Sequence, residues 1–129
     1  MQEVLIRRRK QQAEKIEIAR EFVRKLRAEI GTLTAWVYGS VARGTFKTWS
    51  DIDVFIAAEN LPNNPMQRLE LLYRHASGGI EPKAWTKSEF LRKLEKGDKQ
   101  LSAMLKERTL LIDELGLEQS LQAKTQTKQ

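Results

Sequence analysis

Two aspartates, Asp51 and Asp53, stand on either side of one apolar residue, Ile52, at the start of an apolar segment. Alternate residues of a β-strand point to the same face, so a strand here would place both carboxylates together and Ile52 in the core. Two neighbouring carboxylates repel each other unless a cation sits between them or one of them keeps its proton. Mg²⁺ prefers oxygen ligands and takes few of them from protein where phosphates and water supply the rest. The pair therefore predicts a site for a hard divalent cation.

A turn of small residues precedes the aspartates. Gly39 and Ser40 leave an apolar segment and lead into residues 41–43, which can begin a helical turn. Unpaired N–H groups in such a turn attract anions, and glycine lets a phosphate approach the backbone closely. The hydroxyl of Ser40 and the guanidinium of Arg43 add donors for phosphate oxygens. Neighbouring strands would bring this turn beside Asp51, so we expect a clamp for a metal-bound triphosphate.

Apolar periodicity and turn residues predict the elements that hold these groups. From the N-terminus, they indicate a helix over 3–30, strands over 34–38 and 52–57, a helix over 65–76, a strand over 80–85, helices from 86 and around 101–105, and a short strand over 109–112. This order predicts a small α/β (α+β) domain in which helices pack on one face of a mixed sheet.

The bulk composition limits the class of protein. A length of 129 residues fits one domain, which we place at 1–120, with a basic helix start over 1–14 and a polar, disordered tail over 121–129. The absence of cysteine excludes disulfides and thiolate metal sites. The first residues lack the apolar run of a signal peptide, and no segment is apolar enough to span a bilayer, so we expect a cytoplasmic protein without membrane contact.

The net charge is +6, and Arg7, Arg8, Arg9 and Lys10 carry a large share of the excess. Such a balance favours a polyanionic partner: a nucleotide, a nucleic acid or an acidic protein face. A basic helix start that is merely solvated explains the same residues. The aromatic residues are few and do not alternate with basic ones, so a stacking surface for single-stranded nucleic acid is not indicated. The charge alone does not choose among these readings.

The segments GSVARG, over 39–44, and SDID, over 50–53, together resemble the signature of the polymerase β nucleotidyltransferase superfamily. The resemblance is greatest to its smallest members, the minimal nucleotidyltransferases that are encoded with HEPN-domain partners as toxin–antitoxin pairs. It covers about residues 15–115. The resemblance implies a nucleotidyltransferase fold and the transfer of a nucleoside monophosphate from a nucleoside triphosphate.

The resemblance also implies a role for each matching residue. Gly39 and Ser40 would grip the β- and γ-phosphates, and Asp51 and Asp53 would bind Mg²⁺ in a site for two metal ions. Arg43 resembles an arginine that such proteins keep in this turn, and either a phosphate contact or a structural role fits it.

A third carboxylate on a neighbouring strand completes the second metal site in the family and helps to deprotonate the acceptor hydroxyl. Glu81 is the candidate here, where many relatives carry aspartate. If Ile80 and Pro82 face the core, Glu81 faces the other way and can join the two aspartates. An edge-strand acid in water is the alternative reading of Glu81.

The resemblance implies Mg²⁺-dependent transfer of AMP from ATP to a hydroxyl. Since the chain has no room for an acceptor-binding domain, a second molecule would complete the site. The two-component systems suggest a tyrosine of a HEPN toxin, which this chain would silence as an antitoxin. Two other functions stay open: a non-catalytic, nucleotide-binding antitoxin subunit, and nucleotidyl transfer to RNA, which only the basic helix supports. The acceptor, the preferred base and the oligomeric state do not follow from the sequence.

Overall fold

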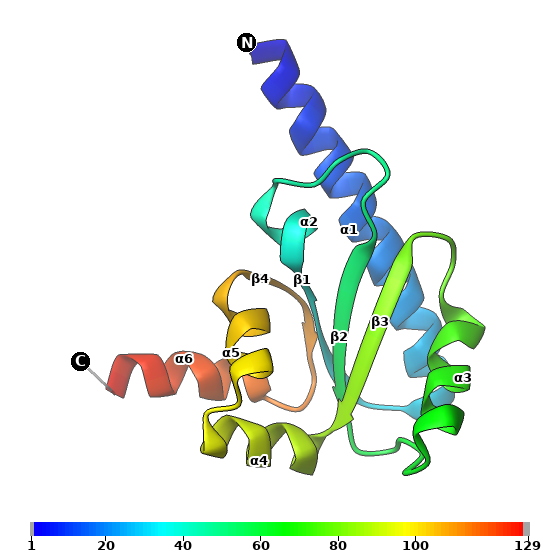
Figure 1. The fold of residues 1–129 in the computed structure, drawn as a ribbon, viewed down its shortest axis with the longest axis vertical. Helices are drawn as coiled ribbons and strands as arrows, with labels where there is room; N and C mark the ends of the chain where they lie inside the picture. The colour runs from blue at the N-terminus through cyan, green and yellow to red at the C-terminus, as the bar shows by residue number, and fades with distance from the viewer. Residues whose placement is uncertain (1, 128–129) are drawn as a thin grey trace.

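The computed structural model describes residues 2–127, apart from the side chains of 124–127. Its elements are α1 (Gln2–Ile30), β1 (Leu33–Tyr38), α2 (Gly39–Arg43), β2 (Ile52–Ala58), α3 (Pro65–His75), β3 (Ile80–Thr86), α4 (Lys87–Lys96), α5 (Lys99–Lys106), β4 (Arg108–Asp113) and α6 (Leu117–Thr127) (Figure 1). The predicted helices and strands are all present, and the predicted helical turn after Ser40 forms α2. No helix within residues 2–127 is both long and apolar enough to cross a membrane.

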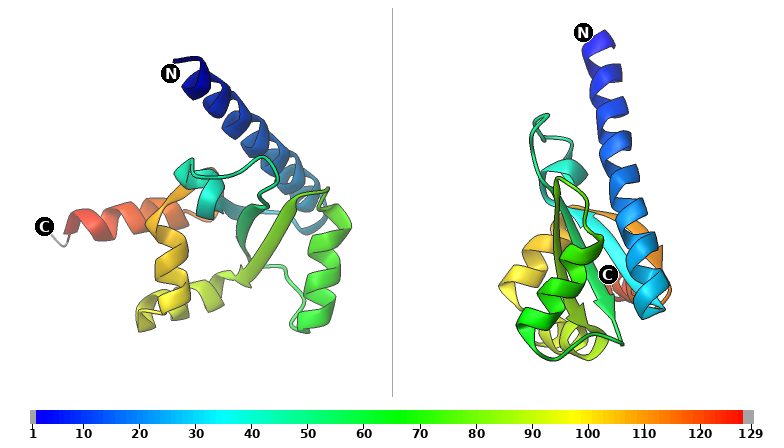
Figure 2. Two further views of the ribbon diagram at one scale, coloured as in Figure 1. Left: turned by 45° about the horizontal axis from the view of Figure 1, so that its top comes forward. Right: turned by 90° about the vertical axis from the view of Figure 1, so that its right-hand side faces the viewer.

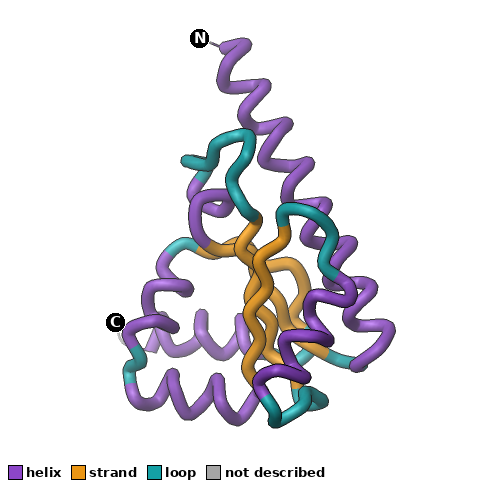
Figure 3. Tube along the Cα trace, turned by 45° about the vertical axis from the view of Figure 1, so that its right-hand side comes forward, coloured by secondary structure: helices purple, strands orange, loops and turns teal. Residues whose placement is uncertain are grey.

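The four strands form one mixed sheet in the order β3-β2-β1-β4. β1 is antiparallel to both β2 and β4, while β2 and β3 are parallel. The end of β1 and the starts of β2 and β3 therefore meet at one end of the sheet. The loop between α2 and β2 and the loop before β3 lie at this end (Figure 3). The mixed sheet confirms the predicted fold class.

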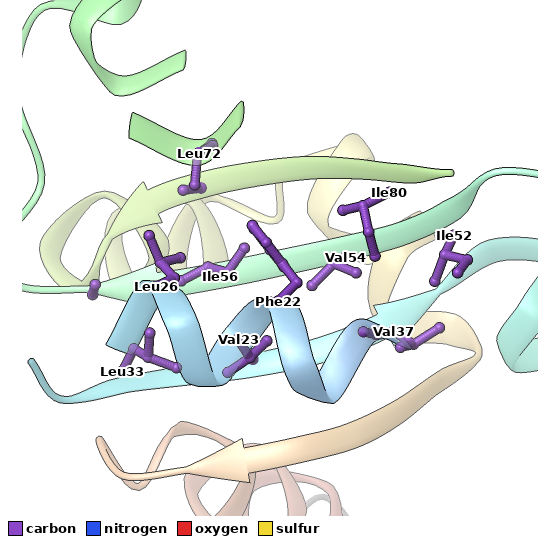
Figure 4. Packing of buried hydrophobic residues seen from close by; sticks show 14 of the residues in the cluster. Phe22, Val23, Leu26, Leu33, Val37, Ile52, Val54, Ile56, Leu72 and Ile80 are labelled. Carbon is purple, nitrogen blue, oxygen red and sulfur yellow. The ribbon is translucent and has the colours of Figure 1, made fainter. Parts of the chain in front are cut away.

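One face of the sheet packs against α1 and α3. Phe22 and Leu26 of α1 lie over Val54 and Ile56 of β2, and Leu72 of α3 belongs to the same buried cluster (Figure 4). These side chains come from alternate positions of the strands, as a pleated sheet requires. The apolar stripe that the sequence predicts for the first helix is the part of α1 that packs on this face.

The opposite face is covered as well, so the prediction that helices pack on one face is wrong. Trp36 of β1 and Phe55 of β2 point to this second face, where they meet Phe90 of α4 and Leu101 of α5. The ring of Trp36 stacks on both Phe55 and Phe90, at centroid distances of 5.5 and 5.7 Å. Figure 2 shows α1 on one side of the sheet and α5 on the other. Strands covered on both faces are near-continuous apolar runs, as β1 and β2 are, and this pattern is the sign of the second layer that the prediction missed.

The chain after Gly116 also differs from the prediction of a disordered tail from 121 onward. Residues 117–127 form α6, and residues 128–129 lie outside the described part of the chain. Leu117 and Leu121, one helical turn apart, are buried in the second cluster. Glu118 between them accepts a hydrogen bond from Trp36 Nε1 at 2.9 Å. Two apolar residues in a polar segment are too few to show as periodicity, although they suffice to anchor the helix.

Candidate active site

The turn from β1 into α2 has the geometry that the sequence predicts. Gly39 begins α2 with a φ of 74°, a left-handed conformation that glycine adopts without a steric penalty. Tyr38, the N-cap residue, makes no side-chain capping hydrogen bond. Gly44 ends the helix, where its N–H donates to the carbonyls of Ser40 and Val41 at 2.9 and 3.2 Å. The first N–H groups of α2 are thus left without a side-chain acceptor, which suits an anion.

The register of the sheet places the acidic residues across adjacent strands. Tyr38 of β1 pairs with Asp53 of β2, and Asp53 pairs with Glu81 of β3. Asp53 is half-buried and Glu81 is exposed. Asp51 is exposed and lies one residue before β2, which begins at the buried Ile52. The alternation predicted around Ile52 is therefore present, and Ile80 and Pro82 are buried as the predicted orientation of Glu81 requires.

Asp53 also lies directly against the backbone of Gly39. A Cβ atom built on Gly39 would collide with Oδ2 of the Asp53 carboxylate. The left-handed φ favours glycine at this position, and any other residue would also displace the carboxylate of Asp53. This contact joins the two halves of the predicted clamp: the anion-binding turn at Gly39 and the carboxylate of Asp53 are immediate neighbours.

The acids influence each other electrostatically. Burial raises the pKa of Asp53, and the negative charges of Glu81 and Asp51 raise it further, against the opposing effect of Arg43 and Lys83. The same acids affect Tyr38. Burial, and to a lesser extent the negative charges of Asp53 and Glu81, raise its pKa to about 12. Several negative charges close together favour the binding of a cation at this point.

The polar side chains of the turn and the acids make no hydrogen bond or ion pair with the described side chains. Within residues 2–127, no side-chain hydrogen bond or ion pair involves Ser40, Arg43, Asp51, Asp53 or Glu81. Some acids elsewhere are paired, such as Glu118 with Arg108. The donors and acceptors at this end of the sheet are therefore free to contact a ligand.

The fit to a metal ion is partial. No group of three or more His, Cys, Asp or Glu side chains in the described residues is close enough to hold a metal ion among them. The carboxylates of Asp51 and Asp53 are hard oxygen donors, which would suit a cation that takes its other ligands from phosphate and water. The participation of Glu81 in a metal site stays a prediction, as do the phosphate contacts of Gly39, Ser40 and Arg43.

Two further features lie near the site. Lys83 lies on the same strand face as Glu81 and lowers the pKa of Asp53. Three side chains of α1, Arg8, Gln12 and Lys15, donate hydrogen bonds to the segment between the turn and Asp51. Their spacing along the helix is the one signal in the sequence that could have identified them.

Comparison with known proteins agrees with this geometry. Residues 16–112 match a family model described as a nucleotidyltransferase domain. A protein of Methanocaldococcus jannaschii named "putative protein adenylyltransferase" is 34% identical over 65 residues, which cover 43% of this chain and 44% of that protein. The chain thus aligns with less than half of that relative's length. The crystal structure of a "putative nucleotidyltransferase" from Sulfolobus solfataricus shares the fold, with a TM-score of 0.61 at 21% identity over 80% of this chain and 84% of that one.

Proposed function

The chain belongs to the family of nucleotidyltransferase domains, and on this premise we propose that it moves AMP from ATP to a hydroxyl group of an acceptor protein in an Mg²⁺-dependent reaction. The contact between Gly39 and Asp53 carries the proposal. An anion held at the start of α2 would lie next to a cation held by the Asp53 carboxylate. A metal-bound triphosphate has this arrangement of charge.

The roles of the individual residues follow from their places. The N–H groups that begin at Gly39, the hydroxyl of Ser40 and the guanidinium of Arg43 would bind the β- and γ-phosphates. Asp51 and Asp53 would hold Mg²⁺, with Glu81 as the third carboxylate. Mg²⁺ would offset the charge of the triphosphate and of the departing pyrophosphate. The protein itself would orient ATP so that its α-phosphorus faces the acceptor.

At the α-phosphorus of ATP, the reaction would form one bond and break one. The acceptor hydroxyl oxygen would attack the α-phosphorus, and the bond from that phosphorus to the bridging oxygen of the β-phosphate would break. Pyrophosphate leaves with the electron pair of that bond. The proton of the hydroxyl would pass to the carboxylate of Glu81, which lies across from Asp53. The product is an acceptor that carries AMP through a phosphodiester bond.

The acceptor that we propose is a tyrosine of a HEPN-domain toxin, which the transfer would silence. Two observations support a protein acceptor: the name of the M. jannaschii relative and the likeness of the 39–44 and 50–53 segments to minimal nucleotidyltransferases. The chain would then act as an antitoxin. We place the reaction in the cytoplasm, where ATP is available.

The experiment uses the purified chain, ATP labelled at its α-phosphorus, Mg²⁺ and the protein encoded by the adjacent gene. We expect label on a tyrosine of that protein, located by mass spectrometry, and none when Asp53→Asn replaces the wild type. Asp98→Asn is the matched control, since Asp98 caps α5 through its side chain and asparagine caps a helix equally well. A complex without label would indicate a non-catalytic binding subunit, and label on added RNA would indicate transfer to RNA. Either result would overturn the proposal.

A further inference from the structure

Three polar side chains of α1 point at the segment that joins Ser40 to Asp51. Arg8, Gln12 and Lys15 are spaced by four and three residues, so they share one face of the helix. Gln12 Nε2 donates to the carbonyl of Val41 at 2.7 Å, inside α2. Arg8 and Lys15 donate to carbonyls further along the segment. The N-terminal half of α1, which extends past the sheet in Figure 1, is thus bound to the loop of the candidate site.

The contact of Arg8 is centred on Phe46. Arg8 Nη2 donates to the carbonyl of Phe46 at 2.5 Å, and its guanidinium lies 4.7 Å from the centroid of the Phe46 ring. The Phe46 ring is fully buried, and Lys15 Nζ lies 5.8 Å from the same centroid. Each of the two cations is attracted to the electron-rich face of the ring. Phe46 anchors the middle of the loop to α1.

Lys15 binds the last residues of the loop. Its Nζ donates to the carbonyls of Thr48 and Ser50, at 3.2 Å each. The backbone there already forms a tight turn, in which the N–H of Ser50 donates to the carbonyl of Lys47 at 2.9 Å. Since Ser50 directly precedes Asp51, Lys15 fixes the backbone at the entry of the first acid.

The side chains of Val41 and Phe46 are buried in the core, but the segment has little regular structure of its own. A helix of five residues, such as α2, does not stabilise itself in water and depends on tertiary contacts. The loop that follows contains no helix or strand up to Ile52. A movement of about 1 Å between reacting groups can lower a rate by about 10²-fold. The spacing between Ser40 and Asp51 therefore depends on contacts from outside the loop.

We propose that Arg8, Gln12 and Lys15 are positioning residues, which hold the anion-binding turn and the entry of Asp51 in register so that the metal and the triphosphate meet in the productive geometry. The inference rests on the proposed function for its consequence in catalysis. It assigns Arg8 a role that its basic neighbours lack: Arg7, Arg9 and Lys10 are exposed, whereas Arg8 is half-buried.

The first experiment measures the loop without nucleotide. Trypsin cleaves after Arg43 and Lys47, which lie between the anchored carbonyls of Val41 and Ser50, so the rate of cleavage there reports how often the loop opens. We expect Arg8→Met and Lys15→Met to speed cleavage after Lys47 about tenfold, and Gln12→Ala to do so after Arg43. Arg9→Met, which removes the same charge from an exposed neighbour, is the matched control and should leave both rates unchanged. Lys15→Arg, which keeps a cationic donor, should restore protection.

The second experiment measures turnover in variants whose circular dichroism matches that of the wild type. Positioning affects the transition state more than the binding of ATP, so Lys15→Met should lower kcat at least tenfold and change KM for ATP less than threefold. Arg9→Met should retain the wild-type kcat. Equal trypsin rates in Lys15→Met and Arg9→Met would overturn this inference, whether or not AMP is transferred. A wild-type chain that transfers no AMP, with loop protection that depends on Lys15, would instead contradict the proposed function.

Discussion

Asp53 and Glu81 occupy paired positions on the neighbouring parallel strands β2 and β3. The pairing brings two acids to the end of the sheet where Gly39 turns the chain into α2. Asp53 is the more confined of the two, since it is half-buried against Gly39 while Glu81 is exposed. Burial and the charge of Glu81 both raise the pKa of Asp53, so its ionised form is less stable in the folded protein than in the unfolded chain.

The first prediction concerns Asp53→Asn, which removes this charge and keeps the shape of the side chain. A raised pKa in the folded state means that stability is lost as the pH rises from the ordinary value of 3.8 through the raised one. We therefore expect the variant to have the higher free energy of unfolding at pH 7, and the difference to disappear below pH 3.8. AMP transfer should fall by about 10³-fold, since the variant loses a metal ligand.

Urea unfolding at the two pH values, together with the transfer assay, checks this prediction. Mg²⁺ should raise the Tm of the wild type more than that of Asp53→Asn, because a ligand that binds only the folded state stabilises it. Asp98→Asn serves as the control again. An Asp53→Asn protein that is less stable than the wild type at pH 7 would show that the carboxylate contributes to folding and not to a cation site.

The second prediction separates backbone strain from the contact with Asp53. Gly39 and Gly97 both have left-handed φ angles, of 74° and 68°, so alanine at either position should cost about 1–2 kcal/mol. A Cβ on Gly97 meets no atom within 4 Å, whereas one on Gly39 collides with the Asp53 carboxylate. Gly39→Ala should therefore be the less stable variant and should lose AMP transfer, while Gly97→Ala keeps it.

Unfolding by urea and the labelling assay measure the two effects on the same preparations. The collision can be relieved by shortening the opposing side chain. Gly39→Ala should lose more free energy of unfolding than Gly97→Ala, because only the first has the collision. A Gly39→Ala, Asp53→Ala double variant should recover this extra loss. If Gly39→Ala retains full transfer, the close approach of Gly39 to Asp53 has no part in the function.

The parts of the site that could be predicted are those encoded by residues close together in sequence. The Gly39–Ser40 turn and the Asp51–Asp53 pair each lie within one short stretch of sequence. A glycine turn and the alternation of side chains along a strand are set by neighbouring residues, so both can be predicted from such a stretch. Glu81 required a longer step, from the burial of Ile80 and Pro82 to the free face of β3, and the register confirms that it lies opposite Asp53.

The rest depends on tertiary packing that short-range patterns do not record. Trp36 and Phe55 point to a second layer, but in strands buried on both faces they cannot be told from the residues of the first. The polar contacts of Arg8 and Lys15 with the loop join residues more than thirty positions apart. In the sequence, Arg8 is one of four consecutive basic residues and Lys15 is a single lysine further along, so neither stands out.

The third prediction concerns Glu81 as proton acceptor or metal ligand. Glu81→Gln should lower kcat by about 10²–10⁴-fold, the usual contribution of a positioned acid or base. Glu81→Asp, which keeps the carboxylate, should retain most of the activity. Because the charge of Glu81 helps to raise the pKa of Tyr38 to about 12, Glu81→Gln should lower that pKa. Tyrosine titration by NMR, with Tyr38→Phe to assign the signal, measures this shift without nucleotide. An unchanged Tyr38 pKa would place Glu81 away from the acids.

The fourth prediction concerns the second layer, which the sequence prediction missed. Glu118 is 6% exposed and accepts hydrogen bonds from Trp36 Nε1 and from Arg108 Nε and Nη2, at 2.9, 2.9 and 2.7 Å. Glu118→Gln removes the charge from this partly buried ion pair and weakens the hydrogen bonds to the guanidinium, so the free energy of unfolding should fall by about 1–3 kcal/mol at pH 7. Glu17→Gln, in an exposed pair with Arg20, should change it by less than about 0.5 kcal/mol.

The pH dependence gives this prediction a second test. The hydrogen bond from Arg108 is the main cause that lowers the pKa of Glu118 below its ordinary 4.5. A lowered pKa in the folded state means that the carboxylate stabilises the protein above pH 4.5 and that this contribution is lost as the pH falls through the lowered value. Urea unfolding between pH 7 and pH 3 should therefore show the wild type and Glu118→Gln converging toward the acid end. A difference that is constant over this range would mean that the lost stability comes from packing around Trp36 and not from the charge of Glu118.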